Sequence, residues 1–243
     1  MLLLLAGTAE ARTVAEKLSE MDIPAIASLA GATKDPADLA IPTRIGGFGG
    51  GDAFEAFLDF KPITAILDAT HPFAQSITRR TAKIAKRRAL PYLQLVRPEW
   101  KVELGDDWTH IAYEEDAAKH IPATATVFLA TGRQSLKRFE NLAGRHLICR
   151  QIDPPDAPFP YPNGSFLIGR PPFSHDDEVA LFKRLSIDWL VVKNAGGAAS
   201  RTKLSAAQEL GIRVAMVARP APTLGARVET TGQAVDWVRG LSW

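Results

Sequence analysis

Hydrophobic runs and amphipathic stretches alternate along the chain. Residues 2–6 and 63–67 form almost wholly apolar runs, which are typical of strands buried on both faces of a parallel sheet. After the first run, the stretch up to Met21 places Val14 and Leu18 on one face of a helix. Strands that alternate with helices in this way predict parallel pairing through right-handed crossovers.

The alternation runs through two halves separated by a polar, irregular segment at residues 97–107. In the first half we predict strands at 2–6, 24–29, 43–46, 63–67 and 92–96, with helices up to 21, through 53–58 and at 72–88. In the second half we predict strands at 109–112, 126–130, 146–151, 189–192, 213–217 and 226–229, a proline-rich loop at 153–163, and helices at 114–120, 133–141, 176–185, 202–210 and 231–239.

This pattern predicts the α/β class, with two doubly wound, Rossmann-like parallel-sheet domains and a cleft between them. The expected boundaries are residues 1–98 for the N-terminal domain and 99–243 for the C-terminal domain. A single large sheet is the alternative.

Composition and charge narrow the classes of partner. The chain has 243 residues, of which 46% are hydrophobic and 23% charged, so it can bury a substantial core. A net charge of +2 favours neither nucleic acid nor an anionic membrane as a partner. Cys149 is the single cysteine, which excludes an intramolecular disulfide and suits a cytoplasmic protein. The first apolar run stops after Ala6 and lacks a basic region before it, so we interpret it as a strand.

The loops that follow strands carry the candidate chemistry, because open parallel sheets bind ligands beyond the carboxyl ends of their strands. After the first strand, Gly7, Thr8, Glu10 and Arg12 lie where a helix begins. A glycine, a hydroxyl group and helix N-terminal amides suit a phosphate. A plain turn in which Thr8 caps the helix is the alternative.

The second strand ends near Ser28, and Gly31, Thr33 and Lys34 follow it. No acidic residue stands there to bind the 2′-hydroxyl of a ribose. Hydroxyl and amine groups suit a 2′-phosphate better, so the pattern favours NADP over NAD.

Asp68, Thr70 and His71 follow the apolar strand at residues 63–67. Polar groups are costly to bury without a role, and histidine exchanges a proton near neutral pH. These residues are therefore candidates for catalysis. The alternative is a local one, in which Asp68 or Thr70 caps the next helix and His71 packs in the turn.

Two loops of the second half offer positive charge. Arg133 follows the strand at 126–130 and is a candidate clamp for a carboxylate. Lys193 follows a buried strand, and Gly196 and Gly197 behind it allow an anion to approach the backbone. Solvated surface charges are the alternative at both loops. His110, His120, His146 and His175 show no metal-ligand spacing with Cys149 or with carboxylates, so we expect no structural zinc and no other metal ligand.

The chain resembles the family of precorrin-6A reductases and their cobalt-precorrin counterparts. The string Asp68-Ala69-Thr70-His71-Pro72-Phe73-Ala74 is the most specific part of this resemblance. Further motifs lie at residues 6–12, 28–31, 44–50, 97–100, 131–133, 169–173, 193–197, 203–207 and 219–220. Ala6 and Ala195 depart from the glycine and serine that are common in the family, and Ala195 removes one hydroxyl contact.

The resemblance implies NADPH-dependent reduction of one double bond of the precorrin-6A macrocycle to give precorrin-6B in cobalamin biosynthesis. It also implies that the cofactor binds between two Rossmann-like domains. The small-molecule tetrapyrrole substrate carries several carboxylates on an apolar ring, which calls for scattered cations and apolar walls. Transient contact with neighbouring enzymes of the pathway is a further expectation.

The candidate site residues fall into three groups. We expect His71 or Asp68 to supply the proton, with solvent as the alternative. The expected cofactor-binding residues are Gly7, Thr8, Glu10, Arg12, Ser28, Gly31, Lys193, Gly196, Gly197 and Lys203. The expected substrate-binding residues are Thr70, Arg97, Arg133, Arg150, Arg170 and Arg201, with walls from Phe48, Phe73, Trp100 and Phe173. The alternatives are a non-catalytic tetrapyrrole-binding protein and a two-domain enzyme similar to uroporphyrinogen-III synthase.

Overall fold

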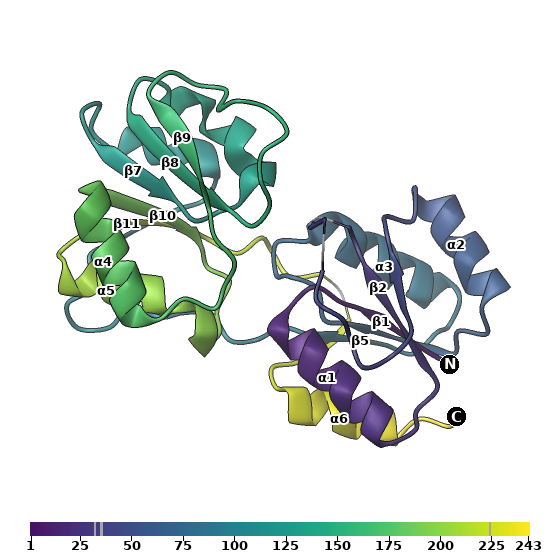
Figure 1. Cartoon of the computed structure of the whole chain (residues 1–243). Helices are drawn as coiled ribbons and strands as arrows, with labels where there is room; N and C mark the ends of the chain where they lie inside the picture. Colours follow the sequence, from purple (N-terminus) through teal and green to yellow (C-terminus); the bar gives the residue numbers. More distant parts are fainter. Residues whose placement is uncertain (32, 35, 224) are drawn as a thin grey trace. The chain divides into compact units, whose positions relative to one another are not determined.

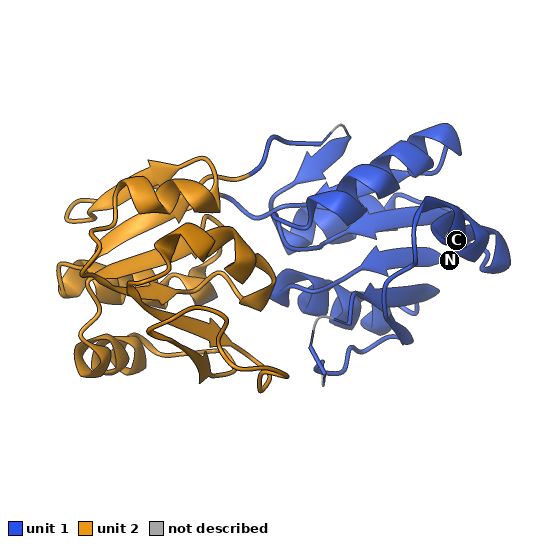
Figure 2. Ribbon diagram, turned by 90° about the horizontal axis from the view of Figure 1, so that it is seen from above, with its two compact units in different colours: residues 1–98, 220–243 blue, residues 99–219 orange. Residues whose placement is uncertain are grey.

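The computed structural model describes residues 1–31, 33–34, 36–223 and 225–243, and it divides into two compact units. Unit 1 consists of Met1–Pro98 and Pro220–Trp243, and unit 2 of Glu99–Arg219 (Figure 2). In the described part of the chain, each unit is built on one six-stranded parallel sheet flanked by helices (Figure 1). The prediction of two doubly wound α/β domains is therefore confirmed, and the alternative of a single large sheet is wrong. The cleft expected between the domains stays a prediction.

The sheet of unit 1 has the strand order β12-β5-β4-β1-β2-β3. Its strands are β1 (Leu2–Leu5), β2 (Ala25–Leu29), β3 (Thr43–Ile45), β4 (Ala65–Asp68), β5 (Tyr92–Leu95) and β12 (Ala226–Val228). Its helices are α1 (Ala9–Glu20), α2 (Gly51–Phe60), α3 (Gln75–Arg87) and α6 (Thr231–Arg239). This is the order of a dinucleotide-binding sheet, with β12 in the sixth place, and the order reverses between β1 and β4.

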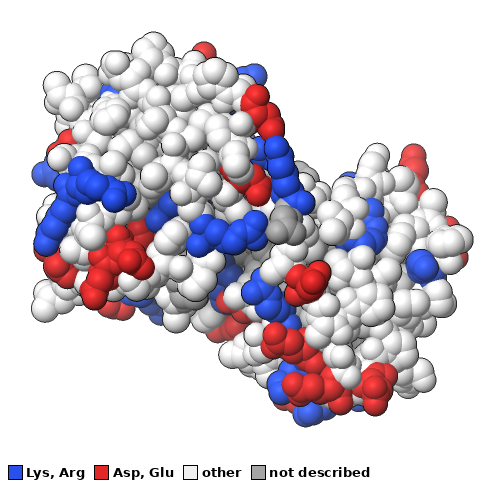
Figure 3. All heavy atoms as spheres, viewed as in Figure 1, with Lys and Arg blue, Asp and Glu red and all other residues white. Residues whose placement is uncertain are grey.

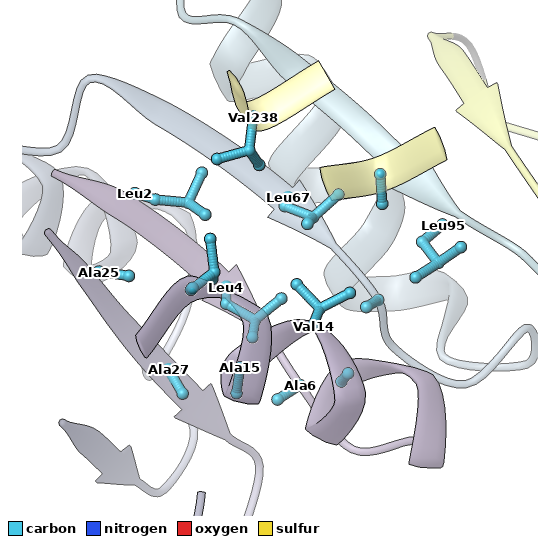
Figure 4. Close-up of a cluster of buried hydrophobic side chains, with 14 of the residues drawn as sticks. Leu2, Leu4, Ala6, Val14, Ala15, Ala25, Ala27, Leu67, Leu95 and Val238 are labelled. Carbon is cyan, nitrogen blue, oxygen red and sulfur yellow. The ribbon is translucent and has the colours of Figure 1, made fainter. Parts of the chain in front are cut away.

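The core of unit 1 explains why β1 is apolar throughout. Leu2 and Leu4 point to one face of the sheet, where they pack with Val14 of α1 and Val238 of α6 (Figure 4). Leu3 and Leu5 belong to a second cluster, which includes Phe54 of α2 and Ile84 of α3. Both faces of the strand are thus covered by helices, as the unbroken hydrophobic run predicts.

The sheet of unit 2 has the strand order β6-β11-β10-β7-β8-β9. Its strands are β6 (Trp108–Ile111), β7 (Thr126–Leu129), β8 (His146–Gln151), β9 (Gly164–Ile168), β10 (Trp189–Lys193) and β11 (Arg213–Val217). Its helices are α4 (His175–Leu185), α5 (Thr202–Glu209) and the 3-10 helices η1 (Glu114–Lys119), η2 (Arg133–Leu142) and η3 (Ala198–Ser200). Phe182 of α4 and Leu204 of α5 pack against Phe128 and Leu190 on one face of this sheet.

The last residues of the chain belong to unit 1 rather than to the second half. The predicted boundary after residue 98 coincides with that of unit 1, whereas residues 220–243, which we expected in the C-terminal domain, return to the first sheet. There β12 pairs with β5, and α6 packs beside α1 through Ala234 and Val238. The apolar face of α6 completes the core around α1. The local sequence of residues 220–243 does not predict this packing, because the partners are distant along the chain.

Smaller differences have local causes. Strand β9 was not predicted, because it follows the proline-rich loop and is only partly buried at the edge of the sheet. Helix α3 begins at Gln75 and not at Pro72, since residues 72 and 73 form a turn that is closed by a bond from the Ala74 amide to the His71 carbonyl (2.7 Å). Among the described residues, no helix has the length and hydropathy needed to cross a membrane. On the face shown in Figure 3, basic and acidic side chains are interspersed.

Candidate functional site

The loop after β1 is fixed by Thr8 and opens onto unfilled space. The Thr8 hydroxyl accepts a hydrogen bond from the Ala11 amide (3.1 Å), and so caps α1, and donates one to the Ala69 carbonyl after β4 (2.8 Å). Gly7 has a φ of +136°, and no described atom lies within 4 Å of the position that a β-carbon would occupy there. The helix cap by Thr8, which we expected as the alternative, is therefore present. As at any helix start, the first backbone amides of α1 have no acceptor within the helix.

Two charged residues of the predicted site pair with each other at this edge. Glu10 in the first turn of α1 forms a salt bridge of 2.6 Å with Arg97, which follows β5. Arg12 is exposed on α1. The structure therefore links a residue that we assigned to the cofactor with one that we assigned to the substrate.

At the ends of β2 and β3, an arginine that sequence reasoning missed contacts the predicted Ser28. Ser28 and Arg44 are register partners on the two strands, and the guanidinium donates a hydrogen bond of 2.8 Å to the buried Ser28 hydroxyl oxygen. Gly31 has a φ of +73°, and a β-carbon there would lie 3.5 Å from the Cα of Gly46. Thr33 and Lys34 lie in the described part of the loop, in which residues 32 and 35 are outside the described residues.

Asp68 ends β4 as a buried acceptor of three hydrogen bonds, with 2% of its surface exposed. Its carboxylate accepts bonds from the Thr70 amide (3.1 Å), the Thr70 hydroxyl (2.7 Å) and the Tyr92 hydroxyl (2.9 Å). Burial, together with the charge of Asp68, raises the pKa of Tyr92. Tyr92 was not predicted, because its contact with Asp68 depends on the register of β4 and β5. The network holds Thr70 in place beside His71.

His71 lies in the turn between β4 and α3. Its Nδ1 accepts a hydrogen bond from the Phe73 amide (3.3 Å), and its ring lies 5.8 Å from the Phe73 ring. Because Nδ1 is an acceptor here, the neutral ring carries its proton on Nε2. The residue thus has a defined orientation and a donor on the opposite side of the ring.

In unit 2, Lys193 ends β10 in a partly buried cluster of polar groups. Its ammonium donates a hydrogen bond to the Ser135 hydroxyl (3.1 Å) and lies 3.5 Å from a carboxylate oxygen of Glu114. Burial lowers the pKa of Lys193, and the nearby Glu114 opposes this shift. Glu114 also pairs with Arg138 at 3.2 Å. Neither Glu114 nor Ser135 was predicted; they belong to η1 and η2, the 3-10 helices that follow β6 and β7.

The glycine-rich loop after Lys193 is held from two sides. Asn194 is buried, and its side chain accepts a hydrogen bond from the amide of Trp100 (2.9 Å) and donates one to the carbonyl of the same residue (3.1 Å). The Trp100 indole donates to the Gly197 carbonyl (2.9 Å), and Arg219 donates to the carbonyls of Asn194 (2.8 Å) and Ala195 (3.0 Å). Trp100, which we expected to form a wall of the substrate site, is thus a buried anchor of this loop.

Arg150 does not have the environment that we expected of a substrate ligand. Its guanidinium forms hydrogen bonds of 2.9 and 2.7 Å with both carboxylate oxygens of Glu178 on α4, and the two side chains are 8% and 1% exposed. The rings of Phe128 and Phe173 lie 4.9 and 4.2 Å from it. Arg150 and Phe173 therefore stabilise the packing of α4 against the sheet.

The other predicted cations of unit 2 also contact oxygen atoms, either of carboxylates or of a backbone carbonyl. Arg133 lies 3.5 Å from Asp156, and Arg170 lies 4.0 Å from Asp153, and both arginines are exposed. Arg201 pairs with Glu103 (2.7 Å), and Lys203 donates to the Ser200 carbonyl (2.7 Å).

Within each unit, the structure places the predicted residues at the carboxyl edge of the sheet or at the helices that follow it. Those of unit 1 are Gly7, Thr8, Glu10, Arg12, Ser28, Gly31, Asp68, Thr70, His71 and Arg97, from the carboxyl ends of β1, β2, β4 and β5. Those of unit 2 are Lys193, Gly196, Gly197, Arg133 and Arg170, from the ends of β7, β9 and β10, with Arg201 and Lys203 at α5. Among the residues that the structure describes, no group of three possible metal ligands occurs.

Three comparisons with known proteins cover nearly the whole chain and agree on its family. Residues 1–239 match the family model described as "Precorrin-6x reductase CbiJ/CobK". The precorrin-6A reductase of Rhodococcus erythropolis is 42% identical over 99% of this chain and 98% of its own length, and that of a Sinorhizobium species is 39% identical over 98% and 93%. The cobalt-precorrin-6A reductase of Priestia megaterium is 27% identical over 97% and 96%.

A solved structure, "CobK precorrin-6A reductase", superposes with a TM-score of 0.94 at 35% sequence identity, covering 98% of this chain and 95% of that one. A full-length match of both sequence and fold excludes the alternative of an enzyme similar to uroporphyrinogen-III synthase. The chain belongs to the precorrin-6x reductase family CbiJ/CobK.

Proposed function

We propose that this protein reduces one double bond of the precorrin-6A macrocycle with NADPH and releases precorrin-6B. The observation that carries the proposal is the loop after β1, where Gly7 leaves open space in front of the first amides of α1. This loop lies where the strand order reverses, which is where dinucleotides bind in sheets of this topology. Membership of the reductase family supports the same reaction.

The residues of unit 1 fit a dinucleotide. The backbone amides of residues 9 and 10 suit a pyrophosphate, since the positive end of the α1 dipole lies there. Thr8 fixes the loop in this conformation from both sides. For the ribose of the adenosine half we propose Ser28, near the end of β2, and Gly31, which follows this strand. NADPH supplies a hydride when bound, and the protein supplies orientation and exclusion of water.

Residues of both units remain proposed ligands. Gly196 and Gly197 have positive φ angles of 69° and 85°, which orient their amides in a way that suits an anion. Lys193, Gly196, Gly197 and Lys203 are proposed cofactor contacts of unit 2. For the carboxylates of the macrocycle we propose Arg97, Arg133, Arg170 and Arg201, together with Thr70. Arg150 is withdrawn from this group because Glu178 already binds both of its terminal nitrogens.

A proton must reach the macrocycle in addition to the hydride. We assign its delivery to the imidazolium form of His71, which gives up the proton on Nε2; protonation of Nδ1 breaks the hydrogen bond that this nitrogen accepts from the Phe73 amide in the neutral ring. Asp68 is buried under three hydrogen-bond donors, which supports a positioning role that acts through Thr70. The two residues expected as alternative proton donors thus have different proposed roles.

An anaerobic assay tests the proposed reaction. We expect NADPH to be consumed when precorrin-6A is added, one equivalent for each macrocycle reduced, and not in its absence. Cobalt-precorrin-6A should be the poorer substrate, because the relatives with the higher identity carry the precorrin-6A name. A change in the macrocycle spectrum without NADPH oxidation, and no NADPH binding in a titration, would instead support the non-catalytic tetrapyrrole-binding protein.

Replacing Gly7 with alanine is expected to weaken NADPH binding about tenfold, or about 1.4 kcal/mol. A β-carbon would enter the open space proposed for the pyrophosphate, and the φ of +136° is unfavourable for any residue with a side chain. The dissociation constant can be measured by the fluorescence of bound NADPH.

Gly211→Ala is the matched control. Gly211 also has a positive φ (+64°) and no described atom within 4 Å of a β-carbon, but it lies in the turn before β11, at the amino ends of the strands. This variant should bind NADPH like the unmodified protein. An unchanged dissociation constant for Gly7→Ala would remove the β1 loop from the cofactor site.

A further inference from the structure

Arg44 is held rigidly at the carboxyl edge of the sheet in unit 1. One terminal nitrogen donates hydrogen bonds to the Ser28 hydroxyl and the Gly46 carbonyl, both 2.8 Å long, and the other donates to the Gly47 carbonyl (3.2 Å). The guanidinium lies over the ring of Phe48, with 4.0 Å between its central carbon and the ring centroid, and 5.5 Å from that of Phe57. These contacts leave the side chain little freedom to reorient.

The charge of Arg44 has no acidic partner in the part of the chain that the structure describes. All three of its hydrogen-bond acceptors are neutral oxygens. By contrast, Arg97, Arg150 and Arg201 each pair with a glutamate. Burial lowers the pKa of Arg44, and no carboxylate of a described residue opposes this shift. A partly desolvated cation is costly unless an anion binds to it.

The surroundings of Arg44 leave room for that anion. A β-carbon on Gly46 or Gly47 would meet no described atom within 4 Å, so the space beside these glycines is open. Ser28 occupies the end of β2, the strand next to β1 in the sheet. In a sheet of this order, the end of the second strand lies next to the adenosine ribose of a bound dinucleotide, and an arginine there accommodates a 2′-phosphate.

We infer that Arg44, together with the Ser28 hydroxyl, binds the 2′-phosphate of the cofactor and makes this protein select NADPH over NADH. The inference rests on the proposed function and deepens it, because it names the residue that decides between the two nicotinamide cofactors. A guanidinium fixed by neutral acceptors suits a phosphate monoester, which brings the negative charge that the described residues do not place beside Arg44.

Binding titrations with the purified full chain test this inference without relying on turnover. The unmodified protein, Arg44→Gln and Arg44→Lys are each titrated with NADPH and NADH, followed by nicotinamide fluorescence. We expect Arg44→Gln to weaken NADPH binding about thirtyfold, within the range for hydrogen bonds to charged groups, and to change NADH binding by less than about twofold. Arg44→Lys keeps the positive charge but lacks the planar guanidinium, so its affinity for NADPH should lie between that of the unmodified protein and that of Arg44→Gln.

A second pair of probes isolates the phosphate from the nicotinamide. Adenosine 2′,5′-bisphosphate should bind more weakly to Arg44→Gln, whereas adenosine 5′-monophosphate should bind both proteins alike, as measured by calorimetry. Arg184→Gln, which removes an exposed charge on α4, is the control and should leave all four ligands unaffected. Thermal unfolding of Arg44→Gln verifies that the variant is folded at the temperature of the titrations.

The outcomes separate the inference from the proposed function. Equal loss of NADPH and NADH binding in Arg44→Gln would overturn the role in selecting the 2′-phosphate. Equal affinity of the unmodified protein for NADPH and NADH would also overturn it, while leaving reduction by a nicotinamide cofactor intact. Failure of the unmodified protein to bind either nucleotide would overturn both.

Discussion

Replacing Glu178 with alanine is expected to lower the free energy of unfolding by about 3–5 kcal/mol. Glu178 accepts two hydrogen bonds from Arg150, and the pair is almost wholly buried beneath α4. Without the carboxylate, the guanidinium would stay between Phe128 and Phe173 with no compensating charge. The loss of stability comes mainly from leaving the buried guanidinium without a counter-charge, and less from losing the attraction within the pair.

Equilibrium denaturation in urea measures the effect, and a double variant identifies its origin. Arg150→Met with Glu178→Leu removes both charges at similar volume, and we expect it to recover most of the lost stability. A Glu178→Ala variant with the unfolding midpoint of the unmodified protein would contradict the structural role of the pair. Arg150→Met with unaltered stability and a raised KM for the tetrapyrrole would return Arg150 to the substrate site.

His71→Asn is expected to lower kcat by about 10²-fold or more, the range for loss of a general acid. The Asn side-chain oxygen can still accept a hydrogen bond from the Phe73 amide, as His71 Nδ1 does, so the turn before α3 should persist. An amide cannot deliver a proton near neutral pH, however. Single-turnover reduction of the macrocycle, followed by its absorbance, measures the chemical step directly.

The pattern of kinetic constants distinguishes a proton donor from a residue of the turn. We expect the dissociation constant of NADPH to be unchanged in His71→Asn, and the pH dependence of kcat to lose the limb that belongs to the histidine. His120→Asn, at an exposed position after η1, should behave like the unmodified protein. If His71→Asn retains full kcat, the proton comes from elsewhere and His71 is a residue of the turn.

The sequence predicted the sheets well because their central strands are buried on both faces. In β1 and β10, unbroken apolar runs leave no reasonable alternative to a strand between covering helices. Residues 220–243 were assigned to the wrong half because β12 and α6 depend on partners distant in sequence. Strand β9 was missed because an edge strand needs little apolar surface.

The sequence was enough to predict which loops carry the candidate site, but not which side chains contact one another there. Gly7, His71 and Lys193 lie at strand ends, a location that topology alone predicts. Arg44 and Tyr92 were missed because their roles arise from register with neighbouring strands. The partner of Arg150 was not foreseen, although the alternation of β8 places Arg150 on the same face as the buried Ile148, toward α4.

The return of the chain to unit 1 constrains the order in which the protein matures. Strand β12 and helix α6 leave the ribosome after all of unit 2, so the first sheet lacks an edge strand, and α1 a covering neighbour, until residues 226–239 have been synthesised. Unit 2 is continuous in sequence and can finish folding beforehand. Unit 1 is therefore the later of the two to mature, and the sheet at whose edge we propose that the nucleotide binds is complete only after β12 and α6 have been added.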